Sequence, residues 1–273
     1  MEYGVALVTG AGSGIGQAVA IRLAELGARV VVTDVSEAGI AETLERIAAG
    51  GGRAMGQRLD VSDPGSVEAA FVAAEAWDKC VDVLVNNAGI VALHGFLDFP
   101  AEDWSRVMAV NVTGSLLCAQ RAGREMVRQG YGRIVNMASV SGIRAGVRRT
   151  AYGTSKAALI GLTRQIALEL APHGVTANAV APGAIVTPLT RDNYTEATVA
   201  SVLPMIPARR MGAPSDIAAA VAYLASPEAG YVNGEVLIVD GGYTAGGMPQ
   251  TGKLDLSAAG AGGPADKARP PVA

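Results

Sequence analysis

The sequence predicts an α/β protein built on a doubly wound, seven-stranded parallel sheet with helices on both faces. Two observations lead to this fold class. Short valine-rich runs alternate with stretches of helical periodicity, and the first run leads through a glycine-rich turn directly into a helix. The 273 residues, 50% of them hydrophobic, can bury one sizeable core, so we expect a single domain over residues 1–247.

The elements are expected in alternating order along the chain. Strands are predicted at residues 5–9, 28–35, 53–61, 81–89, 132–139, 174–181 and 234–242. Helices are predicted at residues 17–27, 36–50, 64–77, 103–129, 151–171 and 214–226. Residues 187–214 are polar and proline-rich and interrupt the alternation, which is typical of a substrate lid. Residues 248–273 are rich in glycine, alanine and proline, a composition that predicts a disordered tail.

Composition argues against several classes of function. The net charge of -3 gives no field that would attract nucleic acid or an anionic membrane, and no run of residues reads as a spanning helix. The N-terminus does not resemble a signal peptide. Two cysteines, Cys80 and Cys118, suit neither a disulfide framework nor a metal cluster, so we expect no metal and a reducing cytoplasm.

The turn at residues 9–16 (TGAGSGIG) predicts a phosphate-binding site. Its glycines, Gly10, Gly12, Gly14 and Gly16, let the backbone turn sharply, and the following helix presents its N-terminal amides and dipole to an anion. The spacing departs from G-x-G-x-x-G, but the strand before the turn and the helix after it favour nucleotide binding.

Acidic and amide side chains are placed to hold the adenosine half of a dinucleotide. Asp34 ends the second strand, eighteen residues after Gly16, where a carboxylate accepts hydrogen bonds from a ribose diol and repels a 2′-phosphate. The sequence therefore favours NAD over NADP, although Asp34 could instead cap the next helix. Asp60 and Asn87 end the third and fourth strands and face the same edge, unless they are turn residues.

The stretch from Ser139 to Lys156 carries groups suited to moving a proton off a hydroxyl. Tyr152 and Lys156 lie four residues apart on a predicted helix, so their charges couple, and an ammonium beside a phenol lowers its pKa toward that of a useful base. A helix-surface pair is the alternative interpretation. Ser139 follows a strand and could hold a substrate oxygen. Asn111 lies among apolar residues, which predicts a specific hydrogen-bond partner.

Together these motifs resemble the short-chain dehydrogenase/reductase family over residues 1–247. The family's T-G-x-x-x-G-x-G turn matches Thr9 to Gly16, its N-N-A-G matches Asn86 to Gly89, and its Y-x-x-x-K matches Tyr152 and Lys156. Further matches are its serine thirteen residues before the tyrosine (Ser139), its helix asparagine (Asn111) and its P-G-x-x-x-T (Pro182, Gly183 and Thr187).

The resemblance implies a Rossmann-type fold and hydride transfer between NAD(H) and a carbinol or carbonyl carbon. Tyr152 would be the general acid/base, Ser139 would hold the substrate oxygen, Lys156 would contact the nicotinamide ribose, and Asn111 would bind a water joining Lys156 to solvent. The residues implied to bind the cofactor are Gly10, Ser13, Gly14, Ile15, Gly16, Asp34, Asp60, Val61, Asn87, Tyr152, Lys156, Pro182, Gly183, Ile185 and Thr187.

The substrate is expected to be small and hydroxylated, such as a sugar, a polyol or a sugar acid. Arg149 lies three residues before Tyr152, and its guanidinium fork would suit a carboxylate or a polyol. Candidate pocket residues are His94, Phe96, Ser139, Ser141, Arg144, Arg149, Tyr152 and Tyr194. The arginines of this loop could equally face solvent or another subunit.

Three other functions stay open. A 3-oxoacyl-(carrier protein) reductase has the same fold and catalytic residues but normally uses NADPH. A nucleotide sugar epimerase or dehydratase has a similar tyrosine and lysine but a longer chain. A cofactor-binding regulator without catalysis is the third. The resemblance also implies subunit pairing through residues 103–129 and 151–171, giving a homotetramer, with a dimer as the next candidate.

Overall fold

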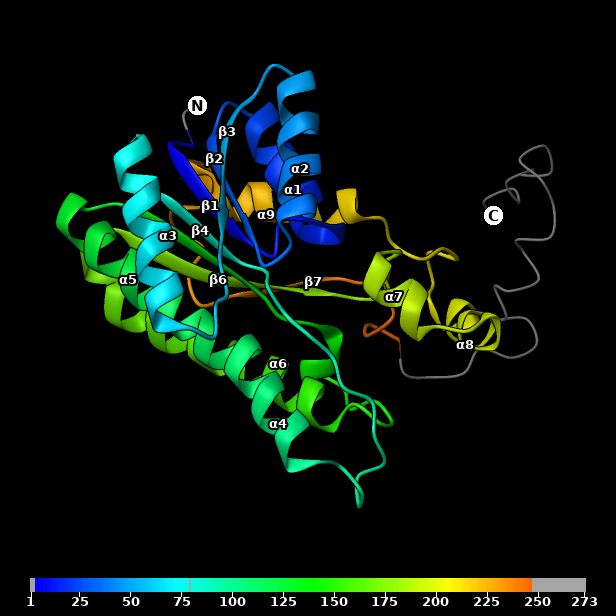
Figure 1. Ribbon diagram of the computed structural model, residues 1–273. Coiled ribbons are helices and arrows are strands. Elements are labelled where there is room, and N and C mark those ends of the chain that lie inside the picture. Colours follow the sequence, from blue (N-terminus) through cyan, green and yellow to red (C-terminus); the bar gives the residue numbers. More distant parts are fainter. Residues whose placement is uncertain (1–2, 79, 247–273) are drawn as a thin grey trace, which may run out of the picture.

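The sheet is parallel throughout and runs in the order β3-β2-β1-β4-β5-β6-β7 (Figure 1). This computed structural model describes residues 3–78 and 80–246, so the expected tail at residues 248–273 lies outside the described residues. The strands are β1 (Val5–Thr9), β2 (Arg29–Asp34), β3 (Arg53–Arg58), β4 (Val83–Asn86), β5 (Gly132–Met137), β6 (Val175–Pro182) and β7 (Val236–Val239). The predicted fold class is confirmed.

The helices alternate with these strands. They are α1 (Gly14–Glu25), α2 (Glu37–Ala49), α3 (Pro64–Trp77), α4 (Ala101–Met108), α5 (Gly114–Gln129), α6 (Thr150–Leu170), α7 (Pro188–Asn193), α8 (Glu196–Val202) and α9 (Pro214–Ala225). A π-helical turn, η1 (Ala109–Thr113), joins α4 to α5, and a 3-10 turn, η2 (Val140–Gly142), follows β5. Within the described residues, none of the helices combines the length and apolar composition that crossing a membrane requires.

Period-two alternation along the strands builds a core on each face of the sheet. In β1, Ala6 and Val8 join the cluster that packs against α1, α2 and α9, whereas Val5 and Leu7 join the cluster that packs against α3, α5 and α6. Figure 1 shows these two groups of helices on opposite sides of the sheet. Both faces are therefore covered, as continuous valine runs in a parallel sheet require.

One predicted helix is divided in the structure. The expected helix at residues 103–129 is interrupted by η1, which contains the buried Asn111. No proline within residues 103–129 marks the interruption in the sequence. π-helical turns of this kind are frequent at functional sites.

The order of the strands sets the position of the site. β1 lies between β2 and β4. The chain therefore winds outward in opposite directions from β1 and from β4, and a crevice forms at the carboxyl ends of these two strands. α7 and α8 of the predicted lid lie beyond the carboxyl ends of the strands (Figure 1).

Candidate active site

A cavity of about 830 Å³ opens along the carboxyl edge of the sheet. It is lined by the glycine turn after β1, by residues that end β2, β3, β4, β5 and β6, and by the lid. Most of the predicted site residues meet there: Gly10, Ser13, Gly14, Ile15, Asp34, Asp60, Val61, Asn87, Ser139, Arg149, Tyr152, Lys156, Pro182, Gly183, Ile185 and Thr187. Gly16, Asn111 and His94 do not line it.

The glycine turn is sterically specified. Gly10 and Gly14 have φ angles of 63° and 56°, which favour glycine, and a Cβ on Gly16 would lie 2.1 Å from the carbonyl oxygen of Gly10. Ser13 precedes α1 and makes no side-chain capping hydrogen bond, and the first turn of α1 has no acidic residue. The N-terminal amides and the dipole of α1 are thus presented to the cavity, a suitable arrangement for a phosphate.

Thr9 and Asn87 hold this turn against β4. The Oγ1 atom of Thr9 accepts hydrogen bonds from the backbone amides of Asn87 and Ala88, both at 3.0 Å. The Nδ2 atom of Asn87 donates to the carbonyl oxygens of Thr9 and Gly10, both at 2.9 Å. Thr9 was predicted only to match a motif, because the partners of its hydroxyl lie more than seventy residues away in the sequence.

The Asp34 carboxylate is fixed at the end of β2 by two backbone amides. Oδ2 accepts from the amide of Gly12 and Oδ1 from the amide of Ser36, each at 2.9 Å. The alternative role as a helix cap belongs to Ser36, whose Oγ accepts from the amide of Gly39 at 3.1 Å. Asp34 therefore presents an anionic acceptor to this end of the cavity.

Asp60 is held in a similar way after β3. Its carboxylate accepts from the backbone amide and from the hydroxyl of Ser62, at 2.9 Å and 2.6 Å. These hydrogen bonds hold the pKa of Asp60 below its usual value. The neighbouring Val61 is buried and packs close to the backbone of Gly114, where a side chain would collide with it.

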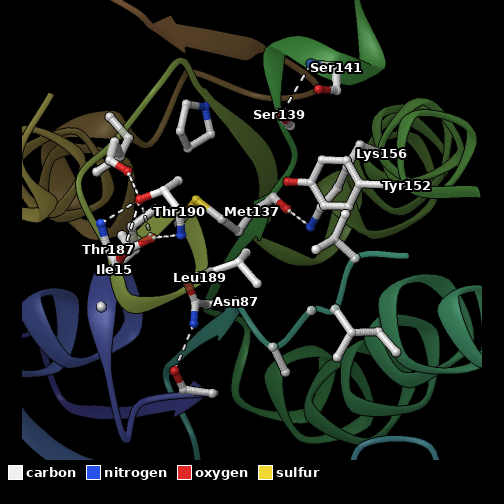
Figure 2. A pocket seen from close by; sticks show the side chains of 18 of the residues that line it. Ile15, Asn87, Met137, Ser139, Ser141, Tyr152, Lys156, Thr187, Leu189 and Thr190 are labelled. Atoms are coloured by element: carbon white, nitrogen blue, oxygen red, sulfur yellow. Dashed lines mark hydrogen bonds between the residues drawn. The ribbon is translucent and has the colours of Figure 1, made fainter. Parts of the chain in front are cut away.

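Tyr152, Lys156 and Ser139 meet at the opposite end of the cavity (Figure 2). Tyr152 and Lys156 lie one turn apart on α6, and the Lys156 Nζ atom is 5.7 Å from the centre of the phenol ring. Ser139 is buried two residues after the end of β5. Its Oγ accepts from the amide of Ser141 at 3.1 Å, so its own O–H can donate. Figure 2 shows the Tyr152 hydroxyl directed into the cavity.

Burial controls the pKa values of Tyr152 and Lys156. Burial raises the pKa of the Tyr152 phenol, while the Ser139 hydroxyl and the Arg149 guanidinium act in the opposite direction. The net direction is opposite to the one expected from the sequence, because burial outweighs these contacts. Burial also lowers the pKa of Lys156 to about 8. The Lys156 ammonium donates to the carbonyl oxygen of Met137 at 2.6 Å.

Asn111 connects the π-helical turn to α6. Its Oδ1 accepts from the amide of Ile90 at 2.8 Å, and its Nδ2 donates to the carbonyl of Ile90 at 3.0 Å and to Ser155 Oγ at 2.9 Å. A Cβ on Gly89 would lie 3.4 Å from both Asn111 Oδ1 and Lys156 Nζ, so the two side chains approach the same point. The predicted partner of this asparagine therefore exists.

The lid begins at Thr187, which caps α7. Its Oγ1 accepts from the amide of Thr190 at 3.2 Å, and its own amide donates to Thr190 Oγ1 at 2.8 Å. This reciprocal pair, shown in Figure 2, fixes the chain as it leaves β6, so that Thr187 and Ile185 line the cavity.

The candidate substrate residues divide into two groups. Arg149, Tyr194, Ser141 and Arg144 line the cavity. His94 does not: its Nε2 lies 2.7 Å from Asp103 Oδ2 and its ring packs edge-on against Phe99, so Leu93 lines the cavity from this loop instead. The Phe96 side chain is largely exposed to solvent and also lies outside the cavity lining.

The fold and the cavity are typical of a nucleotide-dependent oxidoreductase. A phosphate cradle at the switch point of a parallel sheet faces a half-buried tyrosine and a buried lysine across one cavity. A family model described as Enoyl-(Acyl carrier protein) reductase matches residues 10–244. The chain belongs to the short-chain dehydrogenase/reductase family and is an NAD(P)-dependent oxidoreductase that acts on CH-OH or carbonyl groups.

Relatives with different substrates resemble the chain over most of its length. It is 43% identical over 242 residues to a 3-oxoacyl-(acyl-carrier-protein) reductase of Vibrio cholerae, covering 89% of this chain and 98% of that protein. It is 38% identical over 240 residues to an NAD-dependent glycerol dehydrogenase of Listeria innocua, covering 88% and 93%. A crystal structure with bound NADP, of an Agrobacterium tumefaciens protein proposed to be a 2-deoxy-D-gluconate 3-dehydrogenase, superposes with a TM-score of 0.84 at 38% identity, covering 90% and 98%.

Proposed function

We propose that this protein is an NAD(H)-dependent dehydrogenase or reductase of a small secondary alcohol or ketone, with Tyr152 as the general acid/base. The observation that carries the proposal is the meeting of Tyr152, Ser139 and Lys156 at one end of a cavity whose other end holds the phosphate cradle and Asp34. A sugar, a polyol or a sugar acid is the proposed substrate class.

The residues present fit NAD(H). The uncapped N-terminus of α1 suits the pyrophosphate, and Asp34, Asp60 and Asn87 suit the adenosine half. Thr187 and the backbone at Ile185 suit the carboxamide, beside Pro182 and Gly183. When bound, the cofactor supplies the nicotinamide carbon that accepts or gives the hydride.

NAD is proposed over NADP because Asp34 offers a carboxylate where a 2′-phosphate would lie. A repulsion of this kind selects by making the wrong cofactor unfavourable. One relative is described as NAD-dependent and a related crystal structure contains NADP, so the proposed preference rests on the carboxylate at Asp34.

Proton transfer is assigned to the side chains of this chain. In the oxidation direction, the Tyr152 phenolate oxygen takes the proton of the substrate hydroxyl while the Ser139 hydroxyl donates a hydrogen bond to the same oxygen. Lys156 holds the nicotinamide ribose. Asn111 positions a water molecule between Lys156 and solvent, so that the proton taken up at Tyr152 can leave the site. In the reduction direction the protonated Tyr152 returns the proton to the carbonyl oxygen.

The 3-oxoacyl-(carrier protein) reductase is the second candidate, and the relative from Vibrio cholerae favours it. Initial rates distinguish the two. NAD reduction is measured with glycerol, sugars, aldonic acids and simple secondary alcohols, and NADPH oxidation with an acetoacetyl thioester. Turnover of a polyhydroxy compound with NAD supports the first proposal, whereas turnover of the thioester alone, with NADPH, replaces it by the second.

A non-catalytic regulator is tested by the same experiment. Such a protein would bind NADH without reducing any member of the panel. The presence of all four residues of the catalytic set, Asn111, Ser139, Tyr152 and Lys156, supports an enzyme.

We place the protein in the cytoplasm as a homotetramer, with a dimer as the alternative. The support for subunit pairing is an apolar groove between α5 and α6, lined by residues that include Leu116, Val127, Leu162 and Ile166. Both helices form the face that a second copy would cover. Sedimentation at several protein concentrations tests this stoichiometry.

A further inference from the structure

The described lining of the substrate end of the cavity contains arginine side chains and no carboxylate. Three arginines, Arg106, Arg144 and Arg149, line the cavity. Among the described lining residues the carboxylates are Asp34 and Asp60, and both lie at the opposite end, after β2 and β3. A substrate bound beside Tyr152 therefore meets cationic groups.

Two of the three arginines already have partners. The Nη2 atom of Arg106 lies 2.8 Å from Asp103 Oδ1 on the same helix. The Nη2 atom of Arg144 donates to the carbonyl oxygen of Gly246 at 3.1 Å, and its side chain belongs to an exposed loop. Arg149 differs because its contacts are aromatic, and no carboxylate among the described residues forms an ion pair with it.

Arg149 lies between the catalytic phenol and the lid. Its guanidinium carbon is 6.0 Å from the centre of the Tyr152 ring and 5.7 Å from the centre of the Tyr194 ring. One of its five N–H groups is used by the hydrogen bond from Nη2 to Tyr194 Oη, at 3.1 Å. Since the Tyr194 oxygen accepts this bond, its own O–H can donate elsewhere. The two side chains thus offer guanidinium N–H groups and a phenol O–H to one ligand.

The backbone beside Arg149 adds to this preference for an anion. Arg149 immediately precedes α6, a helix of 21 residues that begins without a side-chain cap and without an acidic residue in its first turn. The positive end of this helix therefore lies at the same place as the guanidinium.

We infer that the substrate carries a carboxylate, or an anion of similar size, and that Arg149 binds this group with the help of Tyr194. The inference rests on the proposed function, since it places the anion relative to a carbinol carbon held by Tyr152. The guanidinium carbon of Arg149 lies 6.0 Å from the centre of the Tyr152 ring, so the acid group must lie close to the carbinol carbon. Short hydroxy acids and oxo acids fit this spacing. The carbinol carbon loses its hydride to the cofactor and the hydroxyl proton goes to Tyr152, while the acid is unchanged.

The test compares an acid with its neutral ester. The probes are 3-hydroxybutanoate and methyl 3-hydroxybutanoate, assayed with NAD, and the variant is Arg149→Gln. Arg148→Gln is the matched control, because Arg148 is an exposed neighbour in the same loop that does not line the cavity. We expect Arg149→Gln to lower kcat/KM for the acid on the order of tenfold to a hundredfold, with a much smaller loss for the ester, because the pKa of Tyr152 also changes. Arg148→Gln is expected to leave both kcat/KM values, for the acid and for the ester, unchanged.

A lid-fastening role for Arg149 predicts a different result. If the residue only holds Tyr194, Arg149→Gln lowers kcat/KM equally for the acid and the ester, and that outcome overturns the inference. A wild-type enzyme that prefers the ester overturns it as well. Tyr194→Phe, which keeps the ring and removes the hydroxyl, should lower kcat/KM for the acid and leave kcat/KM for the ester unchanged.

Binding measurements separate this inference from the proposed function. Calorimetric titration of the enzyme–NAD complex with 3-oxobutanoate measures affinity for the acid without turnover, because neither the oxidised cofactor nor the oxo acid can give a hydride. Acid binding that Arg149→Gln weakens at least tenfold supports the anion site even if no alcohol is oxidised, in which case the proposed dehydrogenase function fails alone. Turnover of neutral polyols with no measurable binding of the acid leaves the proposed function standing and refutes the anion site.

Discussion

The Nζ atom of Lys156 lies 2.6 Å from the carbonyl oxygen of Met137, the last residue of β5. This hydrogen bond joins α6, which carries Tyr152, to the strand whose end carries Ser139. Only 4% of the surface of Lys156 is exposed, so the ammonium is separated from water and its pKa falls to about 8. The burial that positions the lysine therefore also means that its charge lowers the free energy of unfolding.

Lys156→Met is expected to stabilise the cofactor-free protein at pH 7 while removing activity. The lysine pKa is about 8 in the folded protein and 10.5 when unperturbed, a difference that corresponds to about 3 kcal/mol. The unfolded state binds more protons between these values, so the wild type gains stability as pH rises from about 8 to 10.5 and carries the full cost below pH 8. Loss of the bond to Met137 offsets about 1 kcal/mol of the gain.

Urea unfolding of both proteins at pH 7 and pH 10 checks this expectation. The free energy of unfolding of the methionine variant should exceed that of the wild type by about 2 kcal/mol at pH 7. This difference should shrink or reverse at pH 10. An advantage that does not change with pH would show that the lysine charge carries no cost in the folded protein.

Tyr152→Phe should separate chemistry from cofactor binding. Removing the hydroxyl removes the acid/base group, and we expect kcat to fall by ~100- to 10,000-fold. The ring keeps its position beside Lys156, so the affinity for NADH, followed by fluorescence titration, should change little. Near-normal turnover by this variant would exclude Tyr152 as the proton donor and acceptor.

Asp34→Ala is expected to narrow the preference for NAD over NADP. The variant loses both the negative charge and the acceptor of the Gly12 amide, whereas Asp34→Asn loses the charge and keeps an acceptor. If charge repulsion sets the preference, both variants should reduce the ratio of kcat/KM values for NAD and NADP, by about tenfold. A ratio that changes in the alanine variant alone would assign the effect to the geometry of the turn.

Thr9→Val tests the clamp on the glycine turn. The substitution keeps the shape of the side chain and leaves the amides of Asn87 and Ala88 without their acceptor, which should cost about 1–3 kcal/mol of unfolding free energy and weaken NADH binding. Thr176→Val is the matched control, because the Thr176 hydroxyl is also buried but has no hydrogen-bond partner in the described part of the chain. Thr176→Val should leave the free energy of unfolding unchanged or raise it. Equal decreases in this free energy for the two variants would contradict the role of Thr9 as a clamp.

Local sequence patterns were sufficient for the fold and for much of the cavity. Period-two and helical periodicities are properties of neighbouring residues, and a spacing of four places Tyr152 and Lys156 on one face of a helix. Contacts between segments that are distant in the sequence could not be predicted from such patterns. The Nδ2 atom of Asn86 donates to Asn136 Oδ1 at 2.9 Å, and this buried pair exists because β4 and β5 are in a register that places the two residues opposite each other.

The same limit explains the expectations that the structure changes. His94 looked available for a ligand because its partner, Asp103, belongs to the next helix and could not be assigned from sequence. The phenol of Tyr152 was expected to have a lowered pKa from its neighbour on the helix, but burial depends on the whole cavity and acts the other way. Both cases depend on neighbours that a local sequence pattern does not reveal.

The bond from Arg144 to the carbonyl of Gly246 bears on how the protein should be handled in the laboratory. Arg144 lines the cavity, so Gly246, the last described residue, lies beside a side chain of the cavity lining, whereas Tyr3 lies next to the amino end of β1, at the opposite edge of the sheet. An affinity tag or a surface linker at the amino terminus leaves the entrance open to substrate. In a protein shortened to Gly246, the same attachment would start beside the cavity, and kinetic constants from the two formats should not be compared directly.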